Sequence, residues 1–263
     1  MLAWKLRSQK TTKSLYIPKL RKMNDHQLPT RWSRISILDL WHSQVASHHN
    51  EKYKGIGFAK FPQDLWTYEK LLHLSDPEVV LEIGVNEGGF TRWLYDRLLA
   101  AQVVDINRRP RTIIGLDIDI KKSTCNLSAL LGTPVVGPDI RLIQCDLLDQ
   151  ESLEKARDQI QSVVNSRSLM IIEDSGHTYE TTKSALDCFS SLLRPGEWLI
   201  VEDTCVDIES LRESLDWPRG ALLATDDFLQ QDQTFERTDF NHAYEITCHP
   251  FGFLRKKLAR IGV

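Results

Sequence analysis

From about residue 78 onward, the chain repeats a pattern: a short apolar run, an acidic residue, then a longer stretch with helical spacing. Runs that are apolar at nearly every position are typical of parallel strands covered on both faces. Strands of this kind that alternate with helices predict a doubly wound α/β sheet. The predicted strands are VVLEIGV (79–85), TIIGLDID (112–119), IRLIQCD (140–146), SLMIIED (168–174) and EWLIVED (197–203).

The stretches between these strands carry apolar side chains three and four positions apart, which predicts amphipathic helices. We expect helices over residues 88–101, 149–164 and 179–193, the last of them ended by a Pro-Gly pair. After residue 204 the pattern loosens, and residues 235–257 contain two extended segments. We expect these segments to form a hairpin at the edge of the sheet.

Composition limits the possible functions. A hydrophobic content of 41% and a charged content of 26% over 263 residues are ordinary for a soluble globular protein. The net charge of -3 argues against a dedicated nucleic-acid binder, and the chain lacks an apolar run long enough to span a membrane. The five cysteines form no Cys-x-x-Cys pair, which favours reduced thiols in a cytoplasmic protein over a disulfide frame or a zinc site.

The N-terminal segment differs from the rest of the chain. Residues 1–34 hold nine lysines and arginines against one acid, Asp25, and they lack the apolar core of a signal peptide. An arm, a surface for an acidic partner and an organelle-targeting segment all stay open. We therefore expect two parts, a basic extension over residues 1–50 and one folded domain over residues 51–263.

Acidic residues stand at or near the end of every predicted strand. In open parallel sheets, ligands bind beyond the carboxyl ends of the strands, where strand order reverses. Each acid alone could be the N-cap of the next helix. Together they predict a ligand site along one rim of the sheet. The acids are Glu82, Asp117, Asp146, Asp174, Glu202 and Asp203.

The first turn of the pattern, EIGVNEGG (82–89), is rich in glycine. Gly84, Gly88 and Gly89 permit a tight turn and a close approach of the backbone to a ligand. Their spacing differs from the Gly-x-Gly-x-x-Gly of dinucleotide sites. A ligand with a cationic ammonium and sulfonium, such as S-adenosylmethionine, suits the nearby carboxylate of Glu82. A strand–helix turn without any ligand is the alternative.

Two further acids match the remaining parts of such a ligand. Asp117 could accept hydrogen bonds from both hydroxyls of a ribose, with Asp119 as the alternative on the same face. Asp146 could accept from an adenine amino group, or it could cap the following helix.

Three acids follow two strands that we expect to be neighbours, Asp174 after one and Glu202 with Asp203 after the other. Adjacent strands lie about 4.8 Å apart, so these carboxylates would repel one another without a cation. Hard oxygen ligands with open positions suit Mg²⁺. A metal ion there would also lower the pKa of a bound substrate hydroxyl.

His177 lies three residues after Asp174 at the start of the next helix, within reach of the predicted metal site. Histidine titrates near neutral pH and could take a proton from the substrate hydroxyl. The alternative is a histidine that only forms a hydrogen bond with a neighbour.

Several motifs in this order resemble the cephalosporin hydroxylase/rhamnosyl O-methyltransferase family, to which macrolide-sugar O-methyltransferases are similar. The resemblance spans about residues 52–256. It implies a Rossmann-like class I methyltransferase fold, with a seven-stranded, mostly parallel sheet and an antiparallel last strand. The motifs are LEIGVNEGGFT (81–91), LDIDI (116–120), IIEDSGHTYE (171–180), LLRPGEWLIVEDT (192–204) and FGFLRK (251–256).

The resemblance also implies an activity, a donor and a metal. Residues 51–263 would form a methyltransferase domain that uses S-adenosylmethionine and Mg²⁺ to methylate a sugar hydroxyl or another vicinal diol of a natural product or glycolipid. The implied donor contacts involve Glu82, Gly84, Gly88, Asp117 and Asp146. The implied metal ligands are Asp174, Glu202 and Asp203, with His177 and Asp174 acting in catalysis.

Two other functions stay open. The chain could keep the donor site without transferring a methyl group, as an accessory module that assists a partner hydroxylase or tailoring enzyme. An NAD-dependent enzyme is the third possibility, and the glycine spacing argues against it. The resemblance also allows a homo-oligomer, since members of this family are often oligomeric, but the sequence shows no legible interface.

Overall fold

The computed structural model describes residues 35–104, 110–131, 138–212, 214, 216–240 and 246–258, with the backbone alone for residues 102–104. The basic segment over residues 1–34 lies outside the described residues, so its role and the expected boundary at residue 50 stay predictions. Helix α2 (Ile37–His48) begins before that boundary and buries Trp41 and Val45. Among the described residues, none of the helices has both the length and the apolar character needed to cross a membrane.

The described residues form one seven-stranded sheet in the order β5-β4-β3-β6-β7-β9-β8. The first five strands in this order pair in parallel, whereas β9 pairs antiparallel with both β7 and β8. This arrangement confirms the predicted fold class and the antiparallel last strand. The strands are β3 (Val79–Ile83), β4 (Thr112–Asp117), β5 (Asp139–Gln144), β6 (Leu169–Glu173), β7 (Trp198–Val201), β8 (Phe235–Arg237) and β9 (Phe253–Lys256).

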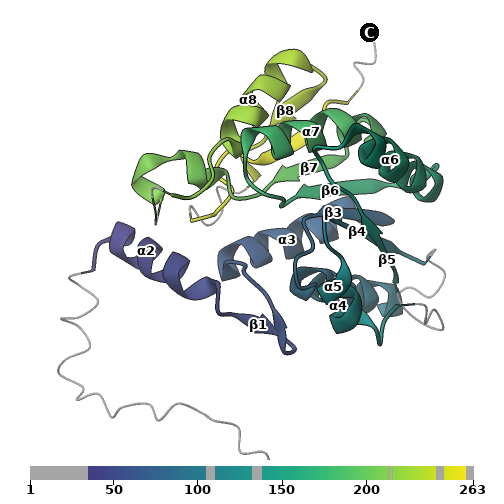
Figure 1. Ribbon diagram of the computed structural model, residues 1–263, viewed down its shortest axis with the longest axis horizontal. Coiled ribbons are helices and arrows are strands. Elements are labelled where there is room, and N and C mark those ends of the chain that lie inside the picture. Colours follow the sequence, from purple (N-terminus) through teal and green to yellow (C-terminus); the bar gives the residue numbers. More distant parts are fainter. Residues whose placement is uncertain are drawn as a thin grey trace, which may run out of the picture. The chain divides into compact units, whose positions relative to one another are not determined.

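Helices cover both faces of this sheet (Figure 1). Apolar side chains of α3 and α4 pack with one face, and those of α6, α7 and α8 pack with the other. Asp149 caps α6 and Thr178 caps α7 through their side-chain oxygens, so both helices begin where the sequence predicts. The helices are α3 (Pro62–Ser75), α4 (Gly89–Val104), α5 (Lys121–Leu127), α6 (Gln150–Val164), α7 (Tyr179–Phe189) and α8 (Ala221–Gln231).

Short elements complete the fold. A hairpin of β1 (Lys52–Tyr53) and β2 (Ile56–Gly57) precedes α3, and 3₁₀ turns η1 (Ser190–Leu192), η2 (Thr204–Asp207) and η3 (Glu209–Leu211) flank β7. The expected C-terminal hairpin is confirmed as β8 and β9. Strand β9 inserts between β7 and β8, so within this hairpin β8 is the strand at the sheet edge.

The alternation of side chains along each strand decides which way its acid points. In β3, Leu81 and Ile83 belong to the core beneath α6 and α7, and Val80 belongs to the core beneath α3 and α4. With a period of two, Glu82 falls on the α3–α4 face. The same alternation along β6 and β7 places the side chains of Asp174 and Glu202 on that face. The strand register pairs Glu173 with Val201, which places Asp174 beside Glu202.

Candidate active site

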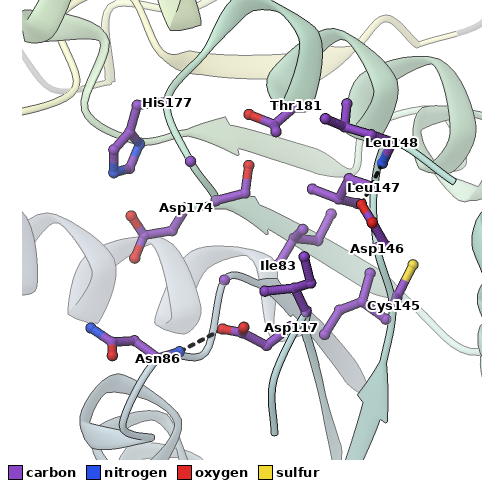
Figure 2. Close-up of a pocket in the computed structure, with 15 residues that line it drawn as sticks. Ile83, Asn86, Asp117, Cys145, Asp146, Leu147, Leu148, Asp174, His177 and Thr181 are labelled. Atoms are coloured by element: carbon purple, nitrogen blue, oxygen red, sulfur yellow. Dashed lines mark hydrogen bonds between the residues drawn. The ribbon is translucent and has the colours of Figure 1, made fainter. Parts of the chain in front are cut away.

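A cavity of about 530 Å³ opens at the carboxyl ends of the parallel strands. Its walls come from the turns after β3, β4, β5 and β6, so it lies where strand order reverses between β3 and β6. Figure 2 shows Asp174 and His177 at one end of this cavity and Asp146, Leu147 and Leu148 at the other. Three of the six acids predicted along this rim, Asp117, Asp146 and Asp174, line the cavity, and ligand binding there stays a prediction.

Glycines shape the turn after β3. Gly84 has a φ of +96°, and a Cβ at this position would collide with the carbonyl oxygen of Asp174. Gly88 has a φ of +90°, and a Cβ there would lie 2.9 Å from Cδ1 of Leu127 in α5. Gly84 lines the cavity, whereas Gly88 is absent from the lining that the described residues form. The local requirement for glycine is thus steric at both positions, and their donor-binding role stays a prediction.

Asp117 fixes the turn after β3 to the end of β4. Its Oδ2 accepts hydrogen bonds from the backbone N–H groups of Val85 at 2.8 Å and Asn86 at 2.7 Å. Its Oδ1 accepts from the N–H of Asp119 at 3.1 Å. Asp117 lines the cavity, so its carboxylate holds the turn in shape and also faces the space for a ligand. The expected hydrogen bonds to a ribose stay a prediction.

Asp146 lies at the far end of the cavity from His177 and accepts a hydrogen bond from the N–H of Leu148 at 2.9 Å. It does not cap α6, because Asp149 does. That alternative for Asp146 is wrong. Beside it, the side chains of Ile118 and Leu148 line the cavity and are exposed. This end of the cavity thus combines apolar walls with one acid.

Glu82 lies in the interior and is absent from the lining of the cavity among the described residues. Its Oε2 accepts a hydrogen bond from the hydroxyl of Thr91 at 2.6 Å, and its Oε1 has no hydrogen-bond partner in the described part of the chain. Burial raises the pKa of Glu82 to about 8. The expected contact with the methionine end of a donor stays a prediction.

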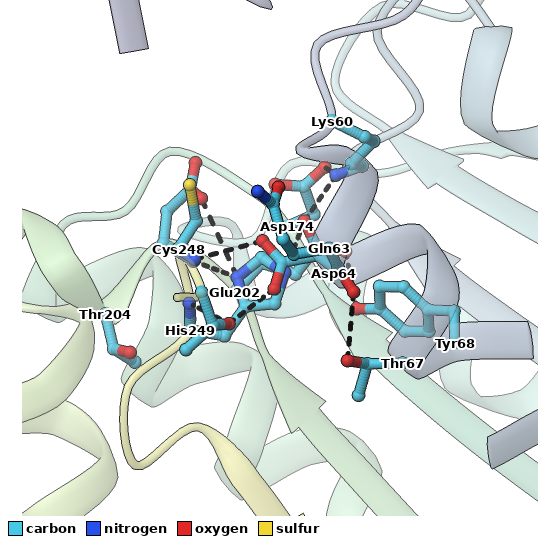
Figure 3. Close-up of polar contacts among 12 residues, drawn as sticks. Lys60, Gln63, Asp64, Thr67, Tyr68, Asp174, Glu202, Thr204, Cys248 and His249 are labelled. Carbon is cyan, nitrogen blue, oxygen red and sulfur yellow. Dashed lines mark hydrogen bonds and ion pairs between the residues drawn. The ribbon is translucent and has the colours of Figure 1, made fainter. Parts of the chain in front are cut away.

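A lysine that the sequence analysis did not single out joins Asp174 and Glu202. The Nζ of Lys60 forms ion pairs with Oδ2 of Asp174 and Oε2 of Glu202, as Figure 3 shows. The hydroxyl of Tyr68 donates to Oε1 of Glu202 at 2.6 Å. Burial opposes the charge of Lys60, but Asp174, Glu202 and Asp203 together raise the pKa of Lys60 well above its usual value. The carboxylates of Asp174 and Glu202 therefore have a counter-charge within the protein.

Asp203 and His177 face each other, and both have left-handed backbones, with φ of +52° and +55°. Nε2 of His177 lies 3.4 Å from Oδ2 of Asp203, while Nδ1 of His177 is buried and has no hydrogen-bond partner among the described residues. Such conformations in non-glycine residues are strained and tend to gather at functional sites. Burial opposes the charge of Asp203, but His177, His249 and Lys60 lower the pKa of Asp203 overall.

His249 supports Asp203 from beneath. Its Nδ1 accepts a hydrogen bond from the N–H of Asp203 at 2.9 Å, so the proton of a neutral ring lies on Nε2. That Nε2 lies 3.6 Å from Oδ2 of Asp64 and 3.7 Å from Oε2 of Glu202. Asp64 in turn accepts from the N–H of Cys248 at 3.0 Å and from the hydroxyl of Thr247. The left-handed turn at Asp203 is therefore held by a buried polar network.

The potential metal ligands fall into overlapping groups. Among the described residues, ligand atoms within 4.8 Å of one another belong to Asp174, His177 and Asp203, to Glu202, Asp203 and His249, and to Asp203, Cys205 and Cys248. Asp203 is common to all three groups. The expected set of Asp174, Glu202 and Asp203 lies in one region, but Lys60 stands between its first two members.

Residues 46–257 match the model of the family described as Rhamnosyl O-methyltransferase/CmcI. The chain belongs to this family. Membership makes the chain an O-methyltransferase and confirms the resemblance seen in its motifs. The family match begins within the last turn of α2 and ends within the last residues that the structure describes.

Individual members of the rhamnosyl O-methyltransferase/CmcI family show how far this likeness extends. The rhamnosyl O-methyltransferase of Mycobacterium tuberculosis (strain ATCC 25618 / H37Rv) is 24% identical over 205 residues, which is 77% of this chain and 76% of the relative. That of Mycobacterium leprae (strain TN) is 25% identical over 154 residues, 58% of this chain and 59% of the relative.

Solved structures of CmcI share the fold. One described as CmcI-N160 apo-structure has a TM-score of 0.52 at 20% identity, covering 80% of this chain and 78% of its own. Another, described as cmcI-D160 Mg-SAM, has a TM-score of 0.54 at 19% identity, covering 91% and 88%. These likenesses establish the class I methyltransferase fold for this member of the family.

Sequence reasoning missed His249 and three further residues of the site, namely Lys60, Asp64 and Tyr68. These three lie on the approach to α3 and along one side of it, four positions apart, and all three are buried. One signal in the sequence could have found Lys60. It is a single cation between Phe58 and Phe61, and a lysine in apolar surroundings needs an acidic partner when it is buried.

Proposed function

We propose that this chain transfers a methyl group from S-adenosylmethionine to a sugar hydroxyl, or to another vicinal diol, of a natural product or glycolipid, with Mg²⁺ as cofactor. The single observation that carries the proposal is the cavity at the strand-order reversal, which ends on Asp174 and His177, with Asp203 3.4 Å from the His177 ring. The family supplies the reaction class, and its relatives named rhamnosyl O-methyltransferases supply the sugar. A CmcI structure described with Mg and SAM supports the donor and the ion.

The shape of the cavity supports an extended donor. The adenine ring would lie between the apolar side chains of Ile118 and Leu148, with Asp146 near its amino group. Asp117 would accept from the ribose hydroxyls at the next turn. The methionine end would then pass the backbone of Gly84, which brings the sulfonium methyl toward the Asp174–His177 end of the cavity.

The residues at that end fit a divalent cation. Asp174 and Asp203 supply hard oxygen ligands, and their side chains keep 18% and 31% of their surface exposed, so the ion would retain open positions. Glu202, the third expected ligand, is engaged by Lys60 and Tyr68. The ion would supply positive charge beside the acceptor oxygen.

His177 is the proposed base. Its Nε2 would take the proton of the acceptor hydroxyl while that oxygen forms a bond to the methyl carbon and the carbon–sulfur bond breaks. The carboxylate of Asp203, 3.4 Å away, would stabilise the imidazolium that results. Holding donor and acceptor in line supplies most of the rate in such transfers, up to roughly 7–11 kcal/mol in favourable cases.

The proposal is tested by incubating the protein with S-adenosylmethionine, Mg²⁺ and a panel of rhamnosides and other glycosides, followed by mass spectrometry. We expect one methyl group to be gained, with loss of activity on chelation and at least a hundredfold loss in His177→Ala. Calorimetry separates the other functions. Donor binding without transfer to any acceptor would favour an accessory module, and binding of NAD in place of the donor would contradict the proposal.

A further inference from the structure

Lys60 is a buried cation in an unusual setting. It lies between β2 and α3, is only 8% exposed, and its Nζ is 4.8 Å from the centre of the Phe90 ring. Its neighbours Phe58 and Phe61 are buried as well. A lysine is almost never buried to this extent without a partner, because removing the ammonium from water is costly. The partners of Lys60 are two of the three acids that the sequence assigns to a metal ion.

The contacts of Glu202 leave it little capacity for a metal ion. One carboxylate oxygen faces Lys60 and the other accepts from the hydroxyl of Tyr68, and the side chain is 1% exposed. Asp174 differs, because only its Oδ2 contacts Lys60 and its side chain is 18% exposed at the wall of the cavity. Asp203 lies on the far side, where it faces His177. The acids therefore divide into Glu202, which Lys60 and Tyr68 enclose, and two that stay partly exposed, Asp174 in the cavity wall and Asp203 beside His177.

We propose that Lys60 is a built-in counter-cation that assembles Asp174 and Glu202 without a metal ion and confines a divalent ion to Asp174 and Asp203, beside His177. This inference rests on the proposed function, since it concerns the metal of that same site. Lys60 neutralises one of three neighbouring negative charges. It is a positioning residue, because it acts on the acceptor only through these carboxylates.

Two consequences follow from the placement of this charge. Without metal, Lys60 removes the repulsion between Asp174 and Glu202, so the metal-free protein keeps the cavity wall in place. When the metal is bound, the ammonium of Lys60 repels it. The affinity of the site for the divalent ion is therefore lower than it would be for the same acids without Lys60. A metal site of this kind binds its ion weakly and reversibly.

The test compares Lys60→Met with Lys54→Met, a matched control whose ammonium pairs with Asp96 and is 50% exposed. Mg²⁺ affinity is measured by calorimetry, and thermal unfolding is followed in EDTA and in excess Mg²⁺. We expect Lys60→Met to have a lower melting temperature in EDTA, a larger gain on adding Mg²⁺, and at least about a tenfold higher Mg²⁺ affinity. Lys54→Met should match the wild type in both measurements. An unchanged or lower Mg²⁺ affinity in Lys60→Met would overturn the proposal.

A second comparison keeps Lys60 in place. Glu202→Gln removes a negative charge near the ion but no ligand, so it should lose clearly less Mg²⁺ affinity than Asp203→Asn, which should lose at least about tenfold. An equal loss in both variants would show that Glu202 is a ligand, and the proposal would fail. If Lys60→Met does not fold in EDTA, the double change Lys60→Met with Glu202→Gln removes both buried charges together. It should fold, and it should bind Mg²⁺ more tightly than Glu202→Gln alone.

These measurements are independent of the acceptor. They use the metal-binding constant and the melting temperature of the whole chain, so they give a result whether or not a methylated product has been found. Failure of the donor to bind would count against the proposed function alone. Failure of Lys60→Met to change Mg²⁺ affinity would count against the counter-cation alone.

Discussion

At the scale of single residues, the site depends on positions whose left-handed backbone conformation is unfavourable for most side chains. Gly84 has a φ of +96°, and a Cβ at this position would collide with the carbonyl oxygen of Asp174. Asp203 and His177 adopt left-handed conformations without being glycines, and His249 fixes the first of them through its backbone N–H. The strain at Asp203 is therefore maintained by a specific hydrogen bond to a buried ring.

Gly84→Ala should destabilise the protein by about 3 kcal/mol or more, because it adds a steric collision to an unfavourable φ. Gly55→Ala is the matched control, since Gly55 has a φ of +90° and nothing within 4 Å of the added Cβ. That control should cost only about 1 kcal/mol. Urea unfolding of both variants measures the difference. Equal costs would show that backbone conformation alone, and not the close approach to Asp174, requires glycine at position 84.

Glu82 should make the stability of the protein fall as pH rises. Its pKa is about 8 in the folded state and about 4.5 in the unfolded chain, so between these values the folded state holds a proton that the unfolded state has lost. The cost of burying this group therefore grows through that window, to on the order of 3–5 kcal/mol by its upper end. Glu82→Gln removes the effect.

Unfolding free energies of the wild type and Glu82→Gln, measured at pH 5 and pH 8, check this prediction. The variant should gain stability relative to the wild type as pH rises. Glu236→Gln, on the exposed edge strand β8, serves as the control. A constant difference between wild type and Glu82→Gln across this range would contradict the assignment.

At the scale of elements, α3 determines which acids are available to a ligand. Its residues Asp64 and Tyr68 lie one turn apart on the same side of the helix, and Lys60 precedes them by another four positions. Lys60 and Tyr68 contact Glu202, which directly follows β7, and Asp64 accepts a hydrogen bond from Cys248 in the segment before β9. These contacts join residues that are 134 to 184 positions apart in the chain. One helix thereby fixes both the buried acid of the metal region and the turn that carries Asp203.

Tyr68→Phe isolates the contribution of α3 to this network. It leaves Oε1 of Glu202 buried without a donor, which should cost about 1–3 kcal/mol of unfolding free energy. Tyr53→Phe removes a part-buried hydrogen bond to Asp96, an acid that retains Lys54 and Arg92 as partners, and should cost less than about 1 kcal/mol. Chemical denaturation of the two variants tests the ranking. A larger cost for Tyr53→Phe would show that Glu202 finds another donor.

At the scale of the whole molecule, the order of the strands brings the parts of the site together. The chain runs outward from β3 to β5, then returns to place β6 on the other side of β3. The turns after β3 and β6 therefore diverge and leave the cavity between them. Because β9 inserts between β7 and β8, the segment that carries His249 passes directly beneath Asp203.

The sequence by itself determined the sheet, the strand–helix alternation and the rim on which the acids lie. These features follow from local periodicity, because a buried parallel strand needs an unbroken apolar run and its first polar residue marks its carboxyl end. The rule of alternation also separates Glu173, which bonds to Thr182 of α7, from Asp174 on the opposite face.

Only the tertiary structure determines which side-chain cation forms ion pairs with those acids. Lys60 lies 114 residues before Asp174 and 142 before Glu202, and no periodicity connects positions so far apart. Their pairing depends on how α3 packs against the sheet, and that packing is the sum of many apolar contacts, none of which carries charge. Local pattern could therefore predict that the carboxylates need positive charge beside them, but only the packing of the chain shows that Lys60 supplies part of that charge.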